Sequence, residues 1–168
     1  LIVIDPRRCE VARRADIHLQ VKPGEDATLL AGMIKIIIEQ NLYDHEYVES
    51  FVSGMQELQW AVNDFDLDYV SRRTQVPADR IEQASEMLAK ARSGAAQEGS
   101  GIHMGRHQNL TNQLVMILNA LCGRYDRRGG MARNEGPLAQ RIPENMGPVN
   151  KPLYSGQVSR VLGIKGTT

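Results

Sequence analysis

The sequence is short of cysteine, has no excess of either charge and has no long hydrophobic run, and each shortage excludes a class of protein. Its two cysteines, Cys9 and Cys122, stand far apart and form no Cys-x-x-Cys pair. A disulfide framework and a cysteine-ligated cluster within this chain are therefore not expected. The 20 Lys and Arg residues balance the 20 Asp and Glu residues, which argues against a nucleic-acid or anionic-membrane surface. No apolar run approaches the ~20 residues that a membrane-spanning helix needs, so membrane insertion is not expected.

The chain starts directly on an apolar segment. Leu1–Ile4 consists of four β-favouring residues and is followed by Asp5 and Pro6. This pattern predicts a strand that is buried on both faces and ends at residue 4. The sequence shows no initiator methionine, polar leader or signal peptide ahead of it. We therefore expect the 168 residues, which correspond to about one domain, to be an internal part of a longer protein.

Glycine divides the chain into a regular and an irregular part. Three of the 15 glycines precede residue 90, and the others follow it. Beyond residue 130, four prolines interrupt a stretch with few aliphatic residues, which cannot form a core of its own. We expect a domain over residues 1–130 and a loop-rich extension over 131–168.

In the regular part, short strands alternate with helices. Strands are predicted over Leu1–Ile4, Asp16–Val21 and, more weakly, Gly94–Glu98. Apolar spacing, capping residues and breakers predict the helices, which are Glu10–Arg14, Ala27–Gln40, Asp44–Gly54, Glu57–Asp64, Leu67–Thr74, Pro77–Arg92 and Leu110–Cys122. Strands joined by helical crossovers form parallel sheets covered by helices. The expected fold is a three-layer, Rossmann-like α/β domain with an irregular C-terminal tail.

Ligands of such sheets bind beyond the carboxyl ends of the strands, which directs attention to three junctions. At Asp5–Arg8, a carboxylate could accept from a ribose or a guanine, and an arginine could hold a phosphate. At Pro23–Asp26, Gly24 would let backbone approach a ligand. At Gly99–Gly105, closely spaced glycines favour packing of backbone against a flat or anionic group. Taken singly, the first two junctions are better interpreted as ordinary turns with solvated or capping charges, and the third does not match the dinucleotide-binding fingerprint.

Catalytic and metal-binding motifs are not evident in the sequence. His103 and His107 stand four residues apart, but Gly105 lies between them and no third ligand is evident, so a zinc site is not expected. No Gly-x-Ser-x-Gly elbow or Walker-type loop occurs.

Read in order, several segments together resemble one known protein family. The segments are Val3–Arg8, Ala15–Leu19, Pro23–Ala27, Ile36–Asp44, Phe51–Gly54, Thr74–Ala78, Leu121–Gly123 and Arg128–Gly130. Their order and spacing are similar to the third domain of the molybdopterin-dependent oxidoreductases of the dimethyl sulfoxide reductase family, which includes formate dehydrogenases and nitrate reductases. The resemblance extends from residue 1 to about residue 130.

The resemblance implies a cofactor and the residues that contact it. Members of this family hold molybdenum, or tungsten, on two molybdopterin guanine dinucleotides, and this domain would bind the guanosine and diphosphate end of one of them. By resemblance, the cofactor-binding residues are Asp5, Arg7, Gly24, Glu25, Asp26, Ser100, Gly101 and Met104. The family often has a smaller residue in place of Glu25 and a glutamine near Met104.

The resemblance also implies a function for the parent protein. It would perform two-electron redox or oxygen-atom transfer on a small substrate, together with its other domains and with electron-transfer subunits. The metal ligand and an iron–sulfur cluster would lie outside these 168 residues, so the chain has no expected catalytic or metal-ligating residue and we expect it to be inactive alone. Two alternatives stay open: a metal-free scaffold subunit of a respiratory complex with this fold, and a generic nucleotide-binding α/β domain.

Overall fold

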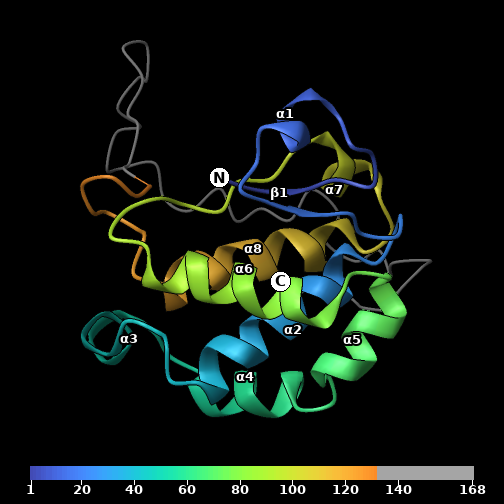
Figure 1. Cartoon of the computed structure of the whole chain (residues 1–168). Helices are drawn as coiled ribbons and strands as arrows, with labels where there is room; N and C mark the ends of the chain where they lie inside the picture. The colour runs from blue at the N-terminus through green and yellow to red at the C-terminus, as the bar shows by residue number, and fades with distance from the viewer. Residues whose placement is uncertain (132–168) are drawn as a thin grey trace, which may run out of the picture. The chain divides into compact units, whose positions relative to one another are not determined.

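A computed structural model describes residues 1–131 of the chain. A small parallel sheet and the short helix α1 (Glu10–Arg13) lie on one side of a layer of longer helices (Figure 1). The expected loop-rich extension over 131–168 lies outside the described residues, apart from Met131, which forms an isolated bridge with Tyr125. None of the described helices is long and apolar enough to cross a membrane.

The sheet consists of β1 (Ile2–Ile4) and β2 (Ile17–Leu19), which run parallel, with Ile2 opposite Ile17. The outer residues of β2 are buried and His18 between them is partly exposed, because successive side chains of a strand point to opposite faces. The predicted α/β class and the parallel pairing of the first two strands are confirmed.

Two predictions about the sheet are wrong. β1 is not buried on both faces, since all three of its residues are half-buried. The segment Gly94–Glu98 forms no strand, and runs irregularly between α6 (Ala78–Lys90) and α7 (Ser100–Met104). Residues 1–131 therefore form a two-stranded sheet in a mostly helical domain, and not a three-layer Rossmann-like sheet. The physical reason is that other groups take the backbone hydrogen bonds that a neighbouring strand would need. The buried side chain of Asn119 bonds to the N–H and the carbonyl of Ala96, and the N–H of Gly94 donates to the carbonyl of Gly129.

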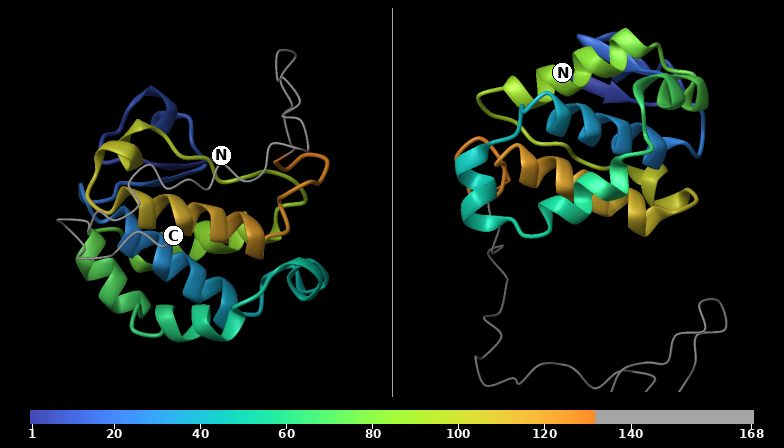
Figure 2. Two further views of the ribbon diagram at one scale, coloured as in Figure 1. Left: turned by 180° about the vertical axis from the view of Figure 1, so that it is seen from behind. Right: turned by 90° about the horizontal axis from the view of Figure 1, so that it is seen from below.

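Helix α2 (Asp26–Glu39) is the centre of the described part. Apolar residues cover most of its circumference, so that nine of its 14 residues are buried. It packs against α5 (Leu67–Thr74), α6 and α8 (Gln108–Leu121), and Figure 2 shows it among these helices. The helix predicted over residues 27–40 is confirmed.

Gly32 allows α2 to approach α5 closely. A Cβ atom added to Gly32 would lie 2.7 Å from Cγ2 of Val70, which is fully buried. No Cβ atom fits at that distance unless the helices move apart. The absence of a side chain at this position is therefore a packing requirement of the core.

The remaining helices begin and end close to the predicted residues. α3 (His45–Phe51) is capped by Asp44, whose carboxylate accepts from the backbone N–H of Tyr47 at 3.0 Å, as predicted. α4 (Met55–Val62) follows Gly54, which has a φ of 86°. The predicted helices over 57–64, 67–74, 77–92 and 110–122 are confirmed, with small differences at their ends.

Candidate functional site

A cavity of about 650 Å³ lies beside β1, at the side that faces the helices. Four of the eight predicted cofactor-binding residues line it: Asp5, Asp26, Ser100 and Gly101. They come from all three predicted junctions. The structure therefore brings the three junctions together, although the third junction does not follow a strand.

The floor of the cavity is apolar. Leu30 and Met33 of α2, and Val115 and Leu118 of α8, are buried against it. A ring placed on this floor would be removed from water, at a gain of roughly 25 cal/mol for each Å² of apolar surface. The floor suits a flat, weakly polar group such as a nucleobase.

The charged side chains that line the cavity are both acidic. Within the described part of the chain, Asp5 and Asp26 are the charged lining residues, and no Lys or Arg lines the cavity. Carboxylates accept hydrogen bonds and donate none when ionised. The interior therefore favours ligand N–H and O–H donors over phosphate.

Asp26 is the first residue of α2, where the helix dipole stabilises a negative charge. Burial raises the pKa of its carboxyl above the ordinary value, and a hydrogen bond with its own backbone N–H opposes part of this rise. Apart from this bond, no group within residues 1–131 forms an ion pair or hydrogen bond with its carboxylate. A partly desolvated carboxylate of this kind gains from a ligand that donates hydrogen bonds.

Asp5 is held in place by the turn after β1. Its Oδ1 accepts from the backbone N–H of Arg7 at 2.7 Å, and its Oδ2 lies 3.6 Å from Sγ of Cys9. Its carbonyl oxygen lies 2.9 Å from Nε2 of His18 on the neighbouring strand. These contacts orient the carboxylate and leave lone pairs on both oxygens for a ligand.

The other four predicted residues lie outside the cavity lining. Arg7 is exposed. Gly24 has a φ of 88° and a Cβ atom there would meet nothing within 4 Å, so its backbone conformation, and not close approach, requires glycine. Met104 is 87% exposed. Its side chain is therefore not part of the cavity.

Glu25 is engaged in contacts within the chain. Its Oε2 accepts from Nε of Arg73 at 3.0 Å and from the hydroxyl of Thr28 at 2.8 Å. Burial by itself would raise the pKa of Glu25, but the hydrogen bonds from Thr28 and Arg73 outweigh it and lower the pKa below the ordinary value. The structure therefore gives Glu25 a role in joining α2 to α5.

The glycine-rich junction forms a short helix, where the sequence predicted a loop. α7 places Ser100 and Gly101 at the cavity. His103 lies 3.7 Å from a carboxylate oxygen of Glu98. Among residues 1–131, no group of three His, Cys, Asp or Glu side chains is close enough to hold a metal ion.

Asn119 of α8 is a positioning residue that the sequence analysis missed. It is 2% exposed, its Oδ1 accepts from the backbone N–H of Ala96 at 2.9 Å, and its Nδ2 donates to the carbonyls of Ala96 and Val115 at 2.9 and 3.1 Å. It thereby fixes the segment 94–98, of which Gly94 to Gln97 line the cavity. The signal in the sequence was an asparagine within the apolar residues of a predicted helix, since a buried amide needs partners.

Comparison with known proteins gives three informative relatives. No family model matches the chain. Acetylene hydratase from Syntrophotalea acetylenica is 37% identical over 125 residues, which cover 74% of this chain and 17% of that protein. Formate dehydrogenase H from Escherichia coli is 41% identical over 102 residues, covering 61% of this chain and 14% of that protein. The assimilatory nitrate reductase catalytic subunit of Bacillus subtilis is 29% identical over 175 residues, covering 97% of this chain and 24% of that protein.

The fold also agrees with a solved structure. The solved structure of acetylene hydratase from Pelobacter acetylenicus superposes on this chain with a TM-score of 0.71 at 37% sequence identity, over 73% of this chain and 17% of that one. The chain thus spans between 14% and 24% of the length of these curated relatives.

Proposed function

The chain belongs to the dimethyl sulfoxide reductase family of molybdopterin oxidoreductases, and from this membership we propose that it binds the guanosine end of a molybdopterin guanine dinucleotide. One observation carries the proposal. Asp5, Asp26 and Ser100, from three separate junctions of the chain, line one cavity with an apolar floor. Two carboxylates and a hydroxyl over an apolar surface form an arrangement that suits a purine nucleoside.

The guanine base fits the cavity through Asp26. Guanine carries two adjacent N–H donors on one edge, and a carboxylate accepts such a pair through two parallel hydrogen bonds. Asp26 has a partly desolvated carboxylate that no side chain of the described part pairs with. The base would cover Leu30 and Met33 of α2, which contribute to the apolar floor. Adenine lacks this pair of donors, so the site would discriminate between the two purines.

The ribose and the diphosphate would lie toward the turn after β1. The carboxylate of Asp5 accepts from a ribose hydroxyl, and the hydroxyl of Ser100 lies on the same cavity. The diphosphate needs positive charge, which the cavity lining does not supply. Arg7 and Arg8 follow Asp5 after one proline, are exposed, and form no ion pair within residues 1–131. They would hold the diphosphate as it leaves the cavity.

The role of this chain is to position the cofactor. The molybdenum or tungsten centre of such a cofactor supplies the redox chemistry, and the described residues bind, orient and desolvate its nucleotide end. The enzyme that contains this chain would perform a two-electron or oxygen-atom transfer on a small substrate, with electron-transfer partners. Its metal ligand and iron–sulfur cluster would come from other parts of that enzyme.

The test is a calorimetric titration of the full chain with GMP and with AMP. Losing a hydrogen bond to a charged group costs roughly 1.5–3 kcal/mol, and every 1.4 kcal/mol is about tenfold in affinity. GMP should therefore bind at least about tenfold more tightly than AMP, and Asp26→Asn should remove most of this preference. Asp68→Asn is the matched control, because Asp68 also lies in the first turn of a helix, is exposed and does not line the cavity. Equal affinities for GMP and AMP would favour a generic nucleotide-binding domain.

A second measurement separates the enzyme from a metal-free scaffold. The enzyme that contains this chain should release about one guanine nucleotide for each dinucleotide that it holds, together with molybdenum or tungsten. Asp26→Asn should lower the nucleotide content, and Asp68→Asn should leave it unchanged. A folded protein with neither metal nor guanine nucleotide would refute the proposal and favour the scaffold.

A further inference from the structure

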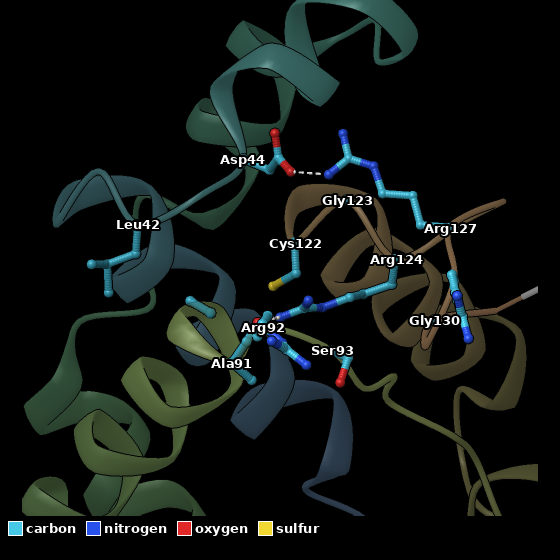
Figure 3. A pocket seen from close by; sticks show the side chains of 12 residues that line it. Leu42, Asp44, Ala91, Arg92, Ser93, Cys122, Gly123, Arg124, Arg127 and Gly130 are labelled. Atoms are coloured by element: carbon cyan, nitrogen blue, oxygen red, sulfur yellow. Dashed lines mark hydrogen bonds and ion pairs between the residues drawn. The ribbon is translucent and has the colours of Figure 1, made fainter.

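A second cavity, of about 310 Å³, lies where α6 and α8 end (Figure 3). Four arginines and one acidic residue are the charged groups that line it within the described part: Arg92, Arg124, Arg127, Arg128 and Asp44. Four positive charges and one negative charge give a formal net charge of +3. In Figure 3 the side chain of Arg124 extends from the end of α8 toward Arg92 and Ala91.

Two of these arginines have no partner in the described part of the chain. Arg127 pairs with Asp44 through Nη1 and Oδ2 at 2.6 Å, so that the two charges neutralise each other. The guanidinium groups of Arg92 and Arg128 form no hydrogen bond or ion pair within residues 1–131. Each guanidinium has five N–H donors in a fixed plane. The cavity therefore carries positive charge that no side chain in the described part neutralises.

Arg124 supplies an independent observation. Its side chain is 7% exposed overall, and its Nη2 donates to the carbonyls of Leu88 at 2.9 Å and Ala91 at 2.7 Å. Its Nε is buried and has no acceptor among the described residues. Buried donors without an acceptor are rare in folded proteins and indicate a missing partner such as an ion or a ligand.

Stabilisation of helix ends explains part of this arrangement. The C-terminus of a helix carries a partial charge of about −0.5, and α6 and α8 both end beside the cavity. The bonds from Arg124 to the last carbonyls of α6 are an interaction of this kind. The two helix ends together supply about −1, which leaves an excess of about +2. The helix ends do not explain why the side chains of Arg92 and Arg128, and the Nε of Arg124, have no partner among residues 1–131.

The cavity offers binding and no covalent chemistry. Cys122 is its one thiol within the described residues, and burial raises the pKa of that thiol to about 11. At neutral pH the sulfur therefore stays protonated and is a poor nucleophile.

We propose that this cavity binds the phosphoryl group of a small molecule, at a site separate from the large cavity. Arg92 enters from the end of α6, whereas Arg124 and Arg128 enter from the end of α8. Donors from different elements suit a tetrahedral oxyanion with several oxygens better than a planar carboxylate. The two cavities share Ala91 and Ser93 in their walls, but they carry opposite charge, so phosphate and nucleobase would be directed to different sites.

The test is a titration of the full chain with inorganic phosphate and with pyrophosphate at low ionic strength. The double variant Arg92→Gln/Arg128→Gln should weaken phosphate binding at least tenfold, and should fold normally because neither side chain contacts the described part of the chain through a hydrogen bond. Arg72→Gln is the matched control, since Arg72 is an exposed arginine at the end of α5. The control should change the affinity less than twofold.

A nuclear magnetic resonance titration identifies the site directly. The Nε–H resonance of Arg124 should shift on addition of phosphate in the parent chain and should not shift in the double variant. A saturating amount of guanosine, which carries no phosphate, should leave the phosphate affinity unchanged. Absence of phosphate binding, equal losses in the double variant and in Arg72→Gln, a stationary Arg124 resonance, or competition by guanosine would each overturn the proposal. The first three of these outcomes are independent of whether a nucleoside binds to the large cavity.

Discussion

Replacing Asn119 by leucine should destabilise the domain and release the segment that lines the large cavity. The side chain of Asn119 forms three hydrogen bonds, two of them with Ala96 and one with Val115. At roughly 0.5–1.5 kcal/mol for each bond, their loss amounts to about 3 kcal/mol. Leucine has a similar volume, so no large cavity adds to this cost. The backbone N–H and carbonyl of Ala96 lose their partners and must find water.

The matched control for this variant is Asn112→Leu on the same helix. Asn112 forms one side-chain hydrogen bond, to an exposed oxygen of Glu98 at 2.7 Å. The control carries the same change in helix propensity, and we expect it to cost less than about 1 kcal/mol, because a single bond at the surface is replaced by bonds to water.

Urea unfolding, followed by circular dichroism, measures the two costs. Hydrogen exchange at the amide of Ala96 measures the local effect, because this amide donates to Asn119. We expect the amide to be protected in the parent chain and in Asn112→Leu, and to exchange rapidly in Asn119→Leu. If Asn119→Leu unfolds within 0.5 kcal/mol of the control, or if the amide of Ala96 stays protected, the positioning role is refuted.

Three further predictions follow from the core and from the titratable groups. Gly32→Ala should destabilise the domain by up to about 2 kcal/mol, since overpacking against Val70 at 2.7 Å costs roughly 1–3 kcal/mol and the helix gains about 1 kcal/mol from alanine. Urea unfolding should show that Val70→Ala relieves the loss in the double variant. The hydrogen bond from the backbone N–H of Tyr47 holds the pKa of Asp44 below its ordinary value of 3.8. The ionised carboxylate therefore stabilises the fold at neutral pH, and this contribution disappears as the pH falls through the lowered pKa. The difference in unfolding free energy between the parent chain and Asp44→Asn should shrink between pH 7 and pH 2, and a constant difference would contradict the assignment. Cys122, with a thiol pKa of about 11, should resist alkylation by iodoacetamide at pH 8 in the folded chain and should react in urea. Mass spectrometry measures the labelling, and rapid labelling of the folded chain would show that the thiol is not buried.

The helices and several of their ends could be predicted because their signals are local. The apolar spacing over residues 27–40 predicts α2 wherever that segment lies, and Asp44 caps α3 through a contact only three residues away. The resemblance of ordered segments to one family also required no knowledge of packing. It is supported by relatives such as acetylene hydratase and formate dehydrogenase H.

The third strand could not be predicted correctly, because a strand is defined by its hydrogen-bonding partner. Gly94–Glu98 has a composition that permits a strand, but in the fold the backbone of Ala96 bonds to the side chain of Asn119. These two residues are 23 positions apart, and no local pattern connects them. The contact of Glu25 with Arg73, 48 residues away, likewise has no local signal in the sequence. Binding of the cofactor by Glu25 stays a prediction.

The sequence by itself determined the helices, the parallel pairing of two strands and the family, because these depend on residue order, spacing and local capping. Only the tertiary structure decided which of the candidate residues share a cavity. It gathered Asp5, Asp26 and Ser100 on one apolar floor and turned Met104 toward solvent. It also brought four arginines around a second cavity at the ends of two helices. The physical reason is that side chains distant in sequence together set the charge of a site and bury its residues from water. They come together only when the chain folds.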